Sequence, residues 1–269
     1  MEKIIMRIYW FIVIYYIFNS CLAFAITPED ARIKLSQLNI TYKKESFFNS
    51  IKDGDIVVVK LFLTSGMSPN SKDFEGYTPL MYASIEGNTA IVNELIKYGA
   101  NVNDVNEKSS STDALFDAAR RGNSGVIKIL LEQGADVNAR YGNWGSNLIC
   151  AARDGYKPII VKELLQSGAN VNDTDDDGTT PLIWASIKGH IQIVEELISF
   201  GADINKKNKN GWTALIGAAN EGHKSIVKAL IAKGAKLNEK ANDGRTALFC
   251  AQLKGNLEIF NLLKEAGAE

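Results

Sequence analysis

Glycines recur along the chain at a nearly constant spacing, and this period restricts the possible folds more than any other feature. The first glycine of each unit is one of Gly54, Gly87, Gly122, Gly155, Gly189, Gly222 and Gly255, at steps of 33, 35, 33, 34, 33 and 33 residues. A second glycine series follows the first by 12 residues in every unit but one. A constant period of this length is typical of repeat proteins, in which similar units stack side by side.

Each unit carries the signals of two helices. Thr78-Pro79-Leu80 and Thr180-Pro181-Leu182 place a capping threonine before a proline at the first helical position. The second half of a unit repeats apolar residues at helical spacing, as in Ile193, Val194 and Leu197. Glycine ends both helices, because it readily adopts the left-handed conformation that follows a helix. Each unit is therefore predicted to be a helix, a tight turn, a second helix and a hairpin loop.

The combined pattern G-x-T-P-L, A-A-x-x-G-H/N, I-V-x-x-L-I and G-A-D-x-N resembles the ankyrin repeat. The resemblance implies an all-α solenoid of stacked helix-turn-helix units joined by β-hairpin loops. It extends over residues 43–269 as a degenerate unit at 43–75, full units at 76–108, 111–143, 144–177, 178–210 and 211–243, and a truncated unit at 244–269. Residues 26–42 are expected to form a capping helix, with Ala31, Leu35 and Leu38 facing the first repeat.

The middle of the array departs from the pattern in several places. The third unit has Asp113 in place of the cap threonine, after two extra residues between Lys108 and Ser111. In the fourth unit Trp144 occupies a glycine position, and one extra residue near Pro158 predicts a widened turn between the two helices. Residues 141–158 are therefore expected to be the least regular part of the array.

Residues 1–25 have the pattern of an export signal. Lys3 and Arg7 precede an apolar run from Ile8 to Phe18, and Ala23-Phe24-Ala25 matches a small-x-small cleavage site. Two alternatives remain open. The apolar stretch could be kept as a membrane anchor, or Cys21 could be a lipidation site, although it lacks the usual leucine three residues before it. The cleaved form predicts a secreted or periplasmic protein, and the anchored form predicts a single-pass membrane protein.

Charge and composition exclude some classes of partner. Lys and Arg number 30 and Asp and Glu 31, so the net charge of −1 shows no basic footprint for nucleic acid. Three cysteines and two histidines are too few for a disulfide framework and argue against a zinc protein. No phosphate-binding glycine loop or nucleophile motif occurs, so we expect no cofactor.

The residues that could support chemistry are spread along the array. His190 and His223 occupy one repeat position in adjacent units, about 10 Å apart at the usual helix packing distance, too far apart to share a metal ion. Cys150 and Cys250 lie three units apart, which predicts free thiols. The run from Asp173 to Gly178 resembles the start of a calcium loop. However, its twelfth position is Trp184 instead of the glutamate that the loop requires.

A protein-binding surface is the remaining possibility. In ankyrin-like folds the hairpin tips and inner helices line a concave face, and the resemblance assigns to it Phe74, Tyr77, Glu86, Arg120, Arg121, Arg153, Lys188, Trp212 and Arg245. Exposed aromatic and arginine side chains often anchor protein interfaces. For Tyr77 and Trp212 a second interpretation stays open, in which the ring lies flat on a neighbouring loop. We expect Trp184 to pack between inner helices.

The sequence as a whole predicts a non-enzymatic, exported ankyrin-repeat protein that binds another protein through its concave face. An enzyme built on the solenoid would require a convergent cluster of titratable residues, which the sequence does not show. A membrane-anchored scaffold would require that the apolar segment within residues 1–25 is retained.

Overall fold

The computed structural model describes residues 26–108 and 112–269. The predicted signal or anchor at 1–25 and the insertion at 109–111 lie outside the described residues. One helix, α2 (Pro28–Gln37), precedes seven helix pairs. The first helices of the pairs are α3 (Lys44–Lys52), α5 (Pro79–Glu86), α7 (Ala114–Arg121), α9 (Asn147–Asp154), α11 (Pro181–Lys188), α13 (Ala214–Glu221) and α15 (Ala247–Leu253). The second helices are α4 (Ile56–Thr64), α6 (Thr89–Lys97), α8 (Ser124–Glu132), α10 (Pro158–Gln166), α12 (Ile191–Ser199), α14 (Lys224–Ala232) and α16 (Leu257–Glu265).

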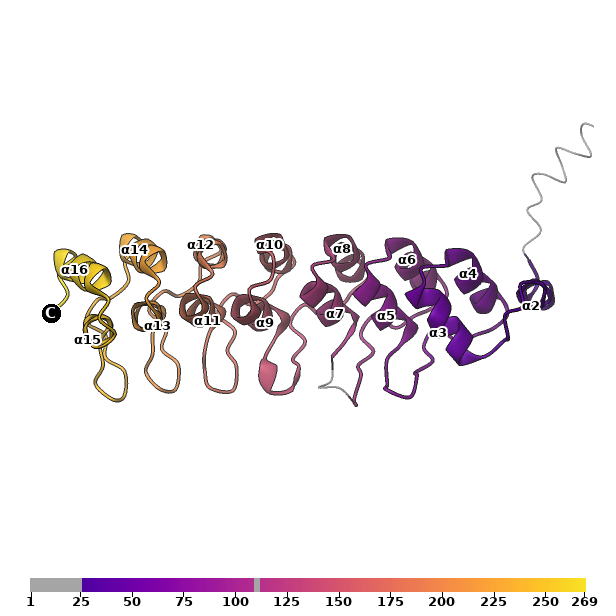
Figure 1. Cartoon of the computed structure of the whole chain (residues 1–269), viewed down its shortest axis with the longest axis horizontal. Helices are drawn as coiled ribbons and strands as arrows, with labels where there is room; N and C mark the ends of the chain where they lie inside the picture. Colours follow the sequence, from indigo (N-terminus) through magenta and orange to yellow (C-terminus); the bar gives the residue numbers. More distant parts are fainter. Residues whose placement is uncertain (1–25, 109–111) are drawn as a thin grey trace, which may run out of the picture.

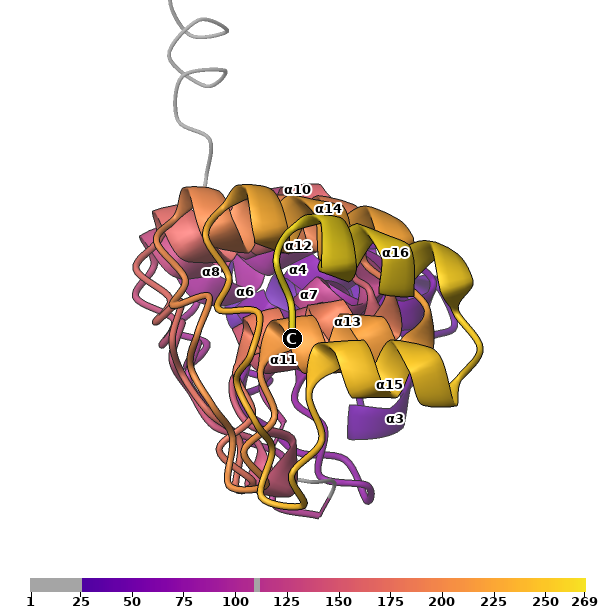
Figure 2. The same cartoon turned by 90° about the vertical axis from the view of Figure 1, so that its left-hand side faces the viewer.

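The helix pairs stand side by side in chain order and form two layers. Figure 1 shows the even-numbered helices from α4 to α16 in the upper layer and the odd-numbered helices from α5 to α15 below them. The loops between units extend beneath the lower layer. Figure 2 shows that the loops project from one end of the lower helices. We call the lower helices, from α3 to α15, the inner helices. The all-α solenoid is thus confirmed.

The loops between units differ in detail from the β-hairpins that were expected. No β-strand forms in residues 26–108 or 112–269, where the loops contribute only two isolated bridges, Asn106 with Thr112 and Arg140 with Ser146. Elsewhere a loop closes on one backbone hydrogen bond, as from Asp73 N–H to the Tyr77 carbonyl oxygen at 3.0 Å. One such bond reverses the chain but is too short a ladder to make a strand.

The capping residues act as the sequence predicts. The Thr78 and Thr180 hydroxyls each accept a hydrogen bond from the backbone N–H three residues later, at 3.2 Å. In the third unit the Asp113 carboxylate replaces the threonine and accepts from Phe116 N–H at 2.8 Å. Gly87 ends α5 with φ at 72°, a left-handed conformation that glycine adopts without a steric penalty.

Helix α2 covers the open end of the first helix pair. Thr27 and Asp30 form a capping box at its start, and Ala31 and Leu35 are buried against the array as predicted. Leu38 was expected to face the first repeat as well, but 53% of its surface is exposed. The prediction was wrong because α2 ends at Gln37, so Leu38 lies beyond the face that packs.

Asparagines clamp each unit to the next one. The Asn103 side-chain amide donates to the Gly134 carbonyl oxygen at 3.0 Å, and its oxygen accepts from Asp136 N–H at 2.9 Å. Asn70 makes the same pair of bonds with Gly99 and Asn101. Because these bonds join residues about one period apart, they hold neighbouring units in register as well as shaping the local turn.

The irregular middle of the array has a simple geometric cause. Two residues separate Gly155 from Pro158 at the start of α10, where most units have one, so the predicted wider turn is confirmed. The loop before α9 contains a short 3-10 turn, Gly142–Trp144, and Gly145 takes the positive φ of 80°. Trp144 therefore avoids the left-handed conformation that its position would otherwise impose. Across the residues described here, no helix has the length and apolar character needed to cross a membrane.

Candidate protein-binding surface

The predicted binding residues lie on two kinds of element. Phe74, Tyr77, Trp212 and Arg245 belong to the loops before α5, α13 and α15. The other five occupy the last turns of inner helices and are Glu86, Arg120, Arg121, Arg153 and Lys188. Inner helices and loops adjoin along the length of the array (Figures 1 and 2), so the elements that carry these residues lie on one elongated side of the molecule.

Two of the predicted aromatic anchors are partly covered. The Tyr77 ring lies 5.2 Å from the Tyr82 ring, and the Arg245 guanidinium lies 5.5 Å from the Trp212 ring centroid. Both aromatic side chains are half-buried. Trp212 thus contacts a residue of the neighbouring loop, as in the second interpretation, whereas the Tyr77 ring packs at a tilt against Tyr82 on α5 of its own unit.

The Trp184 side chain forms a hydrogen bond within its own unit. Its indole Nε1–H donates to the Asp175 carboxylate at 2.7 Å, and the ring is half-buried. Tyr82 occupies the same repeat position and donates from its hydroxyl to Asp73 at 2.8 Å. These bonds tie an inner helix to the loop before it, in addition to the predicted packing of Trp184 on the helices.

The middle of this side is basic. Arg120, Arg121 and Lys188 are exposed, and none of them has an ion-pair partner in the described part of the chain. Arg153 pairs with Asp154 at 2.8 Å and lies 5.9 Å from the Trp144 ring centroid. Exposed arginine side chains attract carboxylates and bind them through paired hydrogen bonds. We call Arg120, Arg121, Arg153 and Lys188 the basic cluster.

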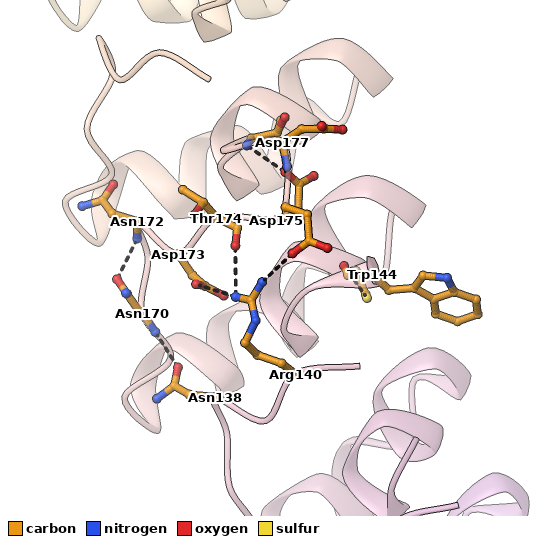
Figure 3. A network of polar contacts seen from close by, with 12 residues as sticks. Asn138, Arg140, Trp144, Asn170, Asn172, Asp173, Thr174, Asp175 and Asp177 are labelled. Atoms are coloured by element: carbon orange, nitrogen blue, oxygen red, sulfur yellow. Dashed lines mark hydrogen bonds and ion pairs between the residues drawn. The ribbon is translucent and has the colours of Figure 1, made fainter. Parts of the chain in front are cut away.

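The acidic loop 173–178 is held by contacts within the protein (Figure 3). Arg140 donates to the Asp173 carboxylate at 3.2 Å and to the Thr174 carbonyl oxygen at 3.0 Å. Asp175 accepts from the backbone N–H groups of Asp177 and Thr179. These carboxylates are therefore engaged in loop and inter-unit bonding. No cluster of three or more potential metal ligands occurs among the residues described.

The histidines lie at the starts of helices, and the cysteines are buried. His190 and His223 are the residues before α12 and α14, and the His223 ring contacts the Ile187 carbonyl oxygen at 2.9 Å. Cys150 and Cys250 are both free and buried. Burial raises the pKa of the Cys150 thiol to about 11, so it is protonated at neutral pH and a poor nucleophile.

One polar cluster was missed at the level of sequence. The Tyr141 hydroxyl donates to the Asp113 carboxylate at 3.0 Å, and the Asn147 side-chain amide donates to the same hydroxyl at 2.7 Å. One turn after Asp113, Asp117 is also buried, and its Oδ2 has no hydrogen-bond partner. An acidic residue at the position that holds Tyr82 and Trp184 in other units was the signal that could have revealed it.

Burial dominates the acid–base behaviour of this cluster. It raises the pKa of Asp113 to about 6, although the bonds from Phe116 N–H and the Tyr141 hydroxyl oppose the shift. It raises the pKa of Asp117 to about 7 against the attraction of Arg120, while the neighbouring Asp113 raises it further. Both carboxylates therefore titrate near neutral pH, and Asp117 lies about one turn before Arg120 and Arg121 on α7.

Comparison with known proteins identifies the architecture. A family model of ankyrin repeats matches three times, over residues 47–141, 143–208 and 193–269. The chain belongs to the ankyrin-repeat family. Ankyrin repeats generally act as scaffolds for protein–protein interaction.

Several curated proteins share part of this sequence. An ankyrin repeat-containing protein of Treponema pallidum (strain Nichols) is 35% identical over 141 residues, which cover 52% of this chain and 46% of that protein. The ankyrin repeat, SAM and basic leucine zipper domain-containing protein 1 of Homo sapiens is 32% identical over 126 residues. Those residues cover 46% of this chain and 26% of the human protein. The matched part thus spans less than half of each relative, and the similarity concerns the ankyrin repeats.

Proposed function

We propose that this chain is a non-catalytic scaffold that binds another protein through its concave inner-helix and loop side. The observation that supports this most directly is the basic cluster on the last turns of three consecutive inner helices, α7, α9 and α11. Arg120, Arg121 and Lys188 form no ion pair in residues 26–108 and 112–269. Both arginines attract the buried Asp117 through space, and the Lys188 ammonium lies 5.9 Å from the Trp184 ring centroid. Charged groups in such an array give a partner orientation and specificity.

The proposal can be tested by reversing charge within the basic cluster. Arg120→Glu and Arg121→Glu together should weaken capture of the native partner by about tenfold or more, since central arginines are frequent hot spots. Partner capture is measured by cross-linking and pull-down from the native compartment, with mass spectrometry. Lys162→Glu, at an exposed position on α10, is the matched control. Equal capture by both variants would refute binding through this side.

The location of the chain is a separate proposal. Lys3 and Arg7 before the apolar run, with Ala23-Phe24-Ala25 after it, support export with cleavage after Ala25. Retention of the segment would instead give a membrane-anchored scaffold with the array outside the cytoplasm. Intact mass spectrometry of the native protein gives the processing site. Release from membranes by carbonate supports the cleaved form, and resistance to it supports the anchor.

A further inference from the structure

The loop before α5 presents an aromatic side chain to solvent. Phe74 is 83% exposed, although large apolar side chains are normally buried at least in part. The equivalent tip positions in three later loops are Asp176, Lys209 and Asn242, all of them polar. An isolated exposed phenylalanine requires no special explanation, but this one borders a cavity.

The backbone beneath Phe74 is held in place. The Lys108 ammonium donates to the Phe74 carbonyl oxygen at 2.9 Å, so the next loop supports this one. Asp73 accepts from Tyr77 N–H at 2.9 Å and from the Tyr82 hydroxyl at 2.8 Å. The ring therefore stands on a preorganised loop, and contacts to it would cost little additional backbone ordering.

A cavity of about 390 Å³ lies elsewhere, between α8 and α10, but its one buried unpartnered oxygen, on Glu163, is closed to solvent. The cavity beside Phe74 is different. It has a volume of about 350 Å³ and lies between α3 and the loop, lined by Phe48, Asn49, Phe74, the three lysines Lys44, Lys52 and Lys72, and the two acidic residues Glu45 and Asp73. Phe48 is buried and packs edge-on against Tyr82 at 5.7 Å, which makes an apolar wall. This volume is large enough for one apolar side chain of a partner.

The charge around the cavity is unbalanced. Lys72 pairs with Asp104 at 2.8 Å, and Glu45 pairs with Lys43 at 2.7 Å. Asp73 accepts hydrogen bonds from neutral groups and keeps its negative charge. Lys44 and Lys52 have no carboxylate within ion-pair distance in the part of the chain that the structure describes. The Lys52 ammonium lies 4.1 Å from the Tyr82 ring centroid, which holds it near the cavity. Three lysines against the two acidic residues leave the lining with one net positive charge. A net positive lining beside an apolar wall favours an apolar group flanked by negative charge.

We propose that this cavity, between α3 and the loop carrying Phe74, binds an aromatic or leucine side chain from an acidic peptide segment of the partner. The proposal rests on the proposed function, because it assigns the cavity as the binding site for one side chain of the same partner. Inner helices α3, α5 and α7 are successive neighbours, so Arg120 and Arg121 lie roughly 20 Å from the cavity by helix packing distances. About six extended residues span that length, so one short acidic segment reaches from the cavity to the basic cluster.

The test selects binders without assuming a sequence. A phage library of random dodecapeptides is selected on the purified full chain, and enriched peptides are measured by fluorescence anisotropy. We expect enriched peptides to place Asp or Glu within three positions of Phe, Trp, Tyr or Leu. Phe74→Ser and the double variant Lys44→Ala with Lys52→Ala should each weaken these peptides by about tenfold. Val57→Ser, an exposed apolar side chain on α4, and Lys233→Glu, beyond α14, should leave the affinity unchanged.

The outcomes separate the two proposals. Peptides that bind equally to the wild-type chain and Phe74→Ser, but are lost on Arg121→Glu, overturn the cavity and leave the proposed function intact. Enriched peptides with no excess of acidic residues overturn the partner chemistry. Self-association in sedimentation velocity that Phe74→Ser abolishes would identify a second copy as the occupant and overturn the proposal. Failure to enrich any peptide overturns the cavity proposal, while the proposed function is decided by the charge-reversal test of partner capture. Circular dichroism checks that each variant keeps its helices.

Discussion

At the scale of the residue, the repeat pattern is locally broken by a buried acid. Tyr82 and Trp184 occupy one inner-helix position and reach a loop aspartate with their polar tips. Asp117 has the same position, but no partner for its Oδ2. Its charged form is therefore poorly compensated, because Arg120 and Arg121 attract it only through space while Asp113 repels it. Leaving a buried polar group unpaired commonly costs about 1–3 kcal/mol.

This acid predicts a pH-dependent stability. Burial holds the folded-state pKa of Asp117 at about 7, above the ordinary aspartate value of 3.8, so the folded state binds its proton more tightly. The stabilisation from the protonated form is complete below about pH 4 and is lost as the pH rises through about 7. Asp117→Asn should therefore raise the free energy of unfolding at pH 8 by about 2 kcal/mol and change it little at pH 4.

Urea unfolding at several pH values measures this effect. Asp53→Asn, at an exposed position after α3, is the control and should leave the profile unchanged. The explanation fails if Asp117→Asn destabilises the chain at pH 8 as much as at pH 4. That result would mean that the carboxylate has a stabilising partner when it is charged.

At the scale of the element, the helix-capping residues and the asparagines that bond the next unit have different roles. Thr78, Asp113 and Thr180 satisfy N–H groups at the start of their own helices. Asn70 and Asn103 instead bond the backbone of the next unit, and Asn205 likewise accepts from Lys236 N–H at 2.8 Å. A helix could form without these inter-unit bonds, but its neighbour would lose a defined position along it.

The clamp predicts a measurable contribution to stability. Asn103→Ala removes two inter-unit hydrogen bonds, and each such bond contributes about 0.5–1.5 kcal/mol net. We expect a loss of roughly 1–2 kcal/mol in the free energy of unfolding, measured by chemical denaturation. Asn93→Ala, at an exposed position within α6, is the matched control and should be close to neutral. Similar losses for the two variants would show that the clamp bonds add nothing.

At the scale of the whole molecule, each unit is stabilised by its neighbours, and the ends differ from the middle. Phe116 and Phe249 occupy the same position in their inner helices, one residue after the leucine that recurs in each unit. Phe116 has units on both sides and is 2% exposed, whereas Phe249 belongs to the last pair and is 50% exposed. A phenylalanine at this repeat position is thus buried to a different extent according to its place in the array.

This difference can be measured by one substitution made at two sites. Phe116→Ala should cost about 3–5 kcal/mol, the usual range for a buried phenylalanine. Phe249→Ala should cost less than about 1.5 kcal/mol, because half of its surface is already in water. Chemical denaturation of both variants provides the comparison. Equal losses would mean that Phe249 is covered in solution, by a further part of a longer chain or by another molecule.

The sequence by itself determined the helix pairs, the helix ends and the order of stacking. These follow from residues close together in the chain, such as Thr180 with Pro181, and from a period that repeats the same packing face. It also placed Phe74, Arg120 and Lys188 correctly at exposed positions. It did not determine that Leu38 points into solvent, that Trp212 lies beneath Arg245, or that Asp117 is buried without a full set of partners.

Only the tertiary structure decided those features, and the cavity beside Phe74 is another of them. Each depends on which side chains of neighbouring units meet across a gap of about 10 Å, the usual distance between packed helices. The period specifies that two units face each other. It does not specify how non-identical side chains at equivalent positions fill the space between them, and in this array the cavity and the unpartnered carboxylate lie in that space.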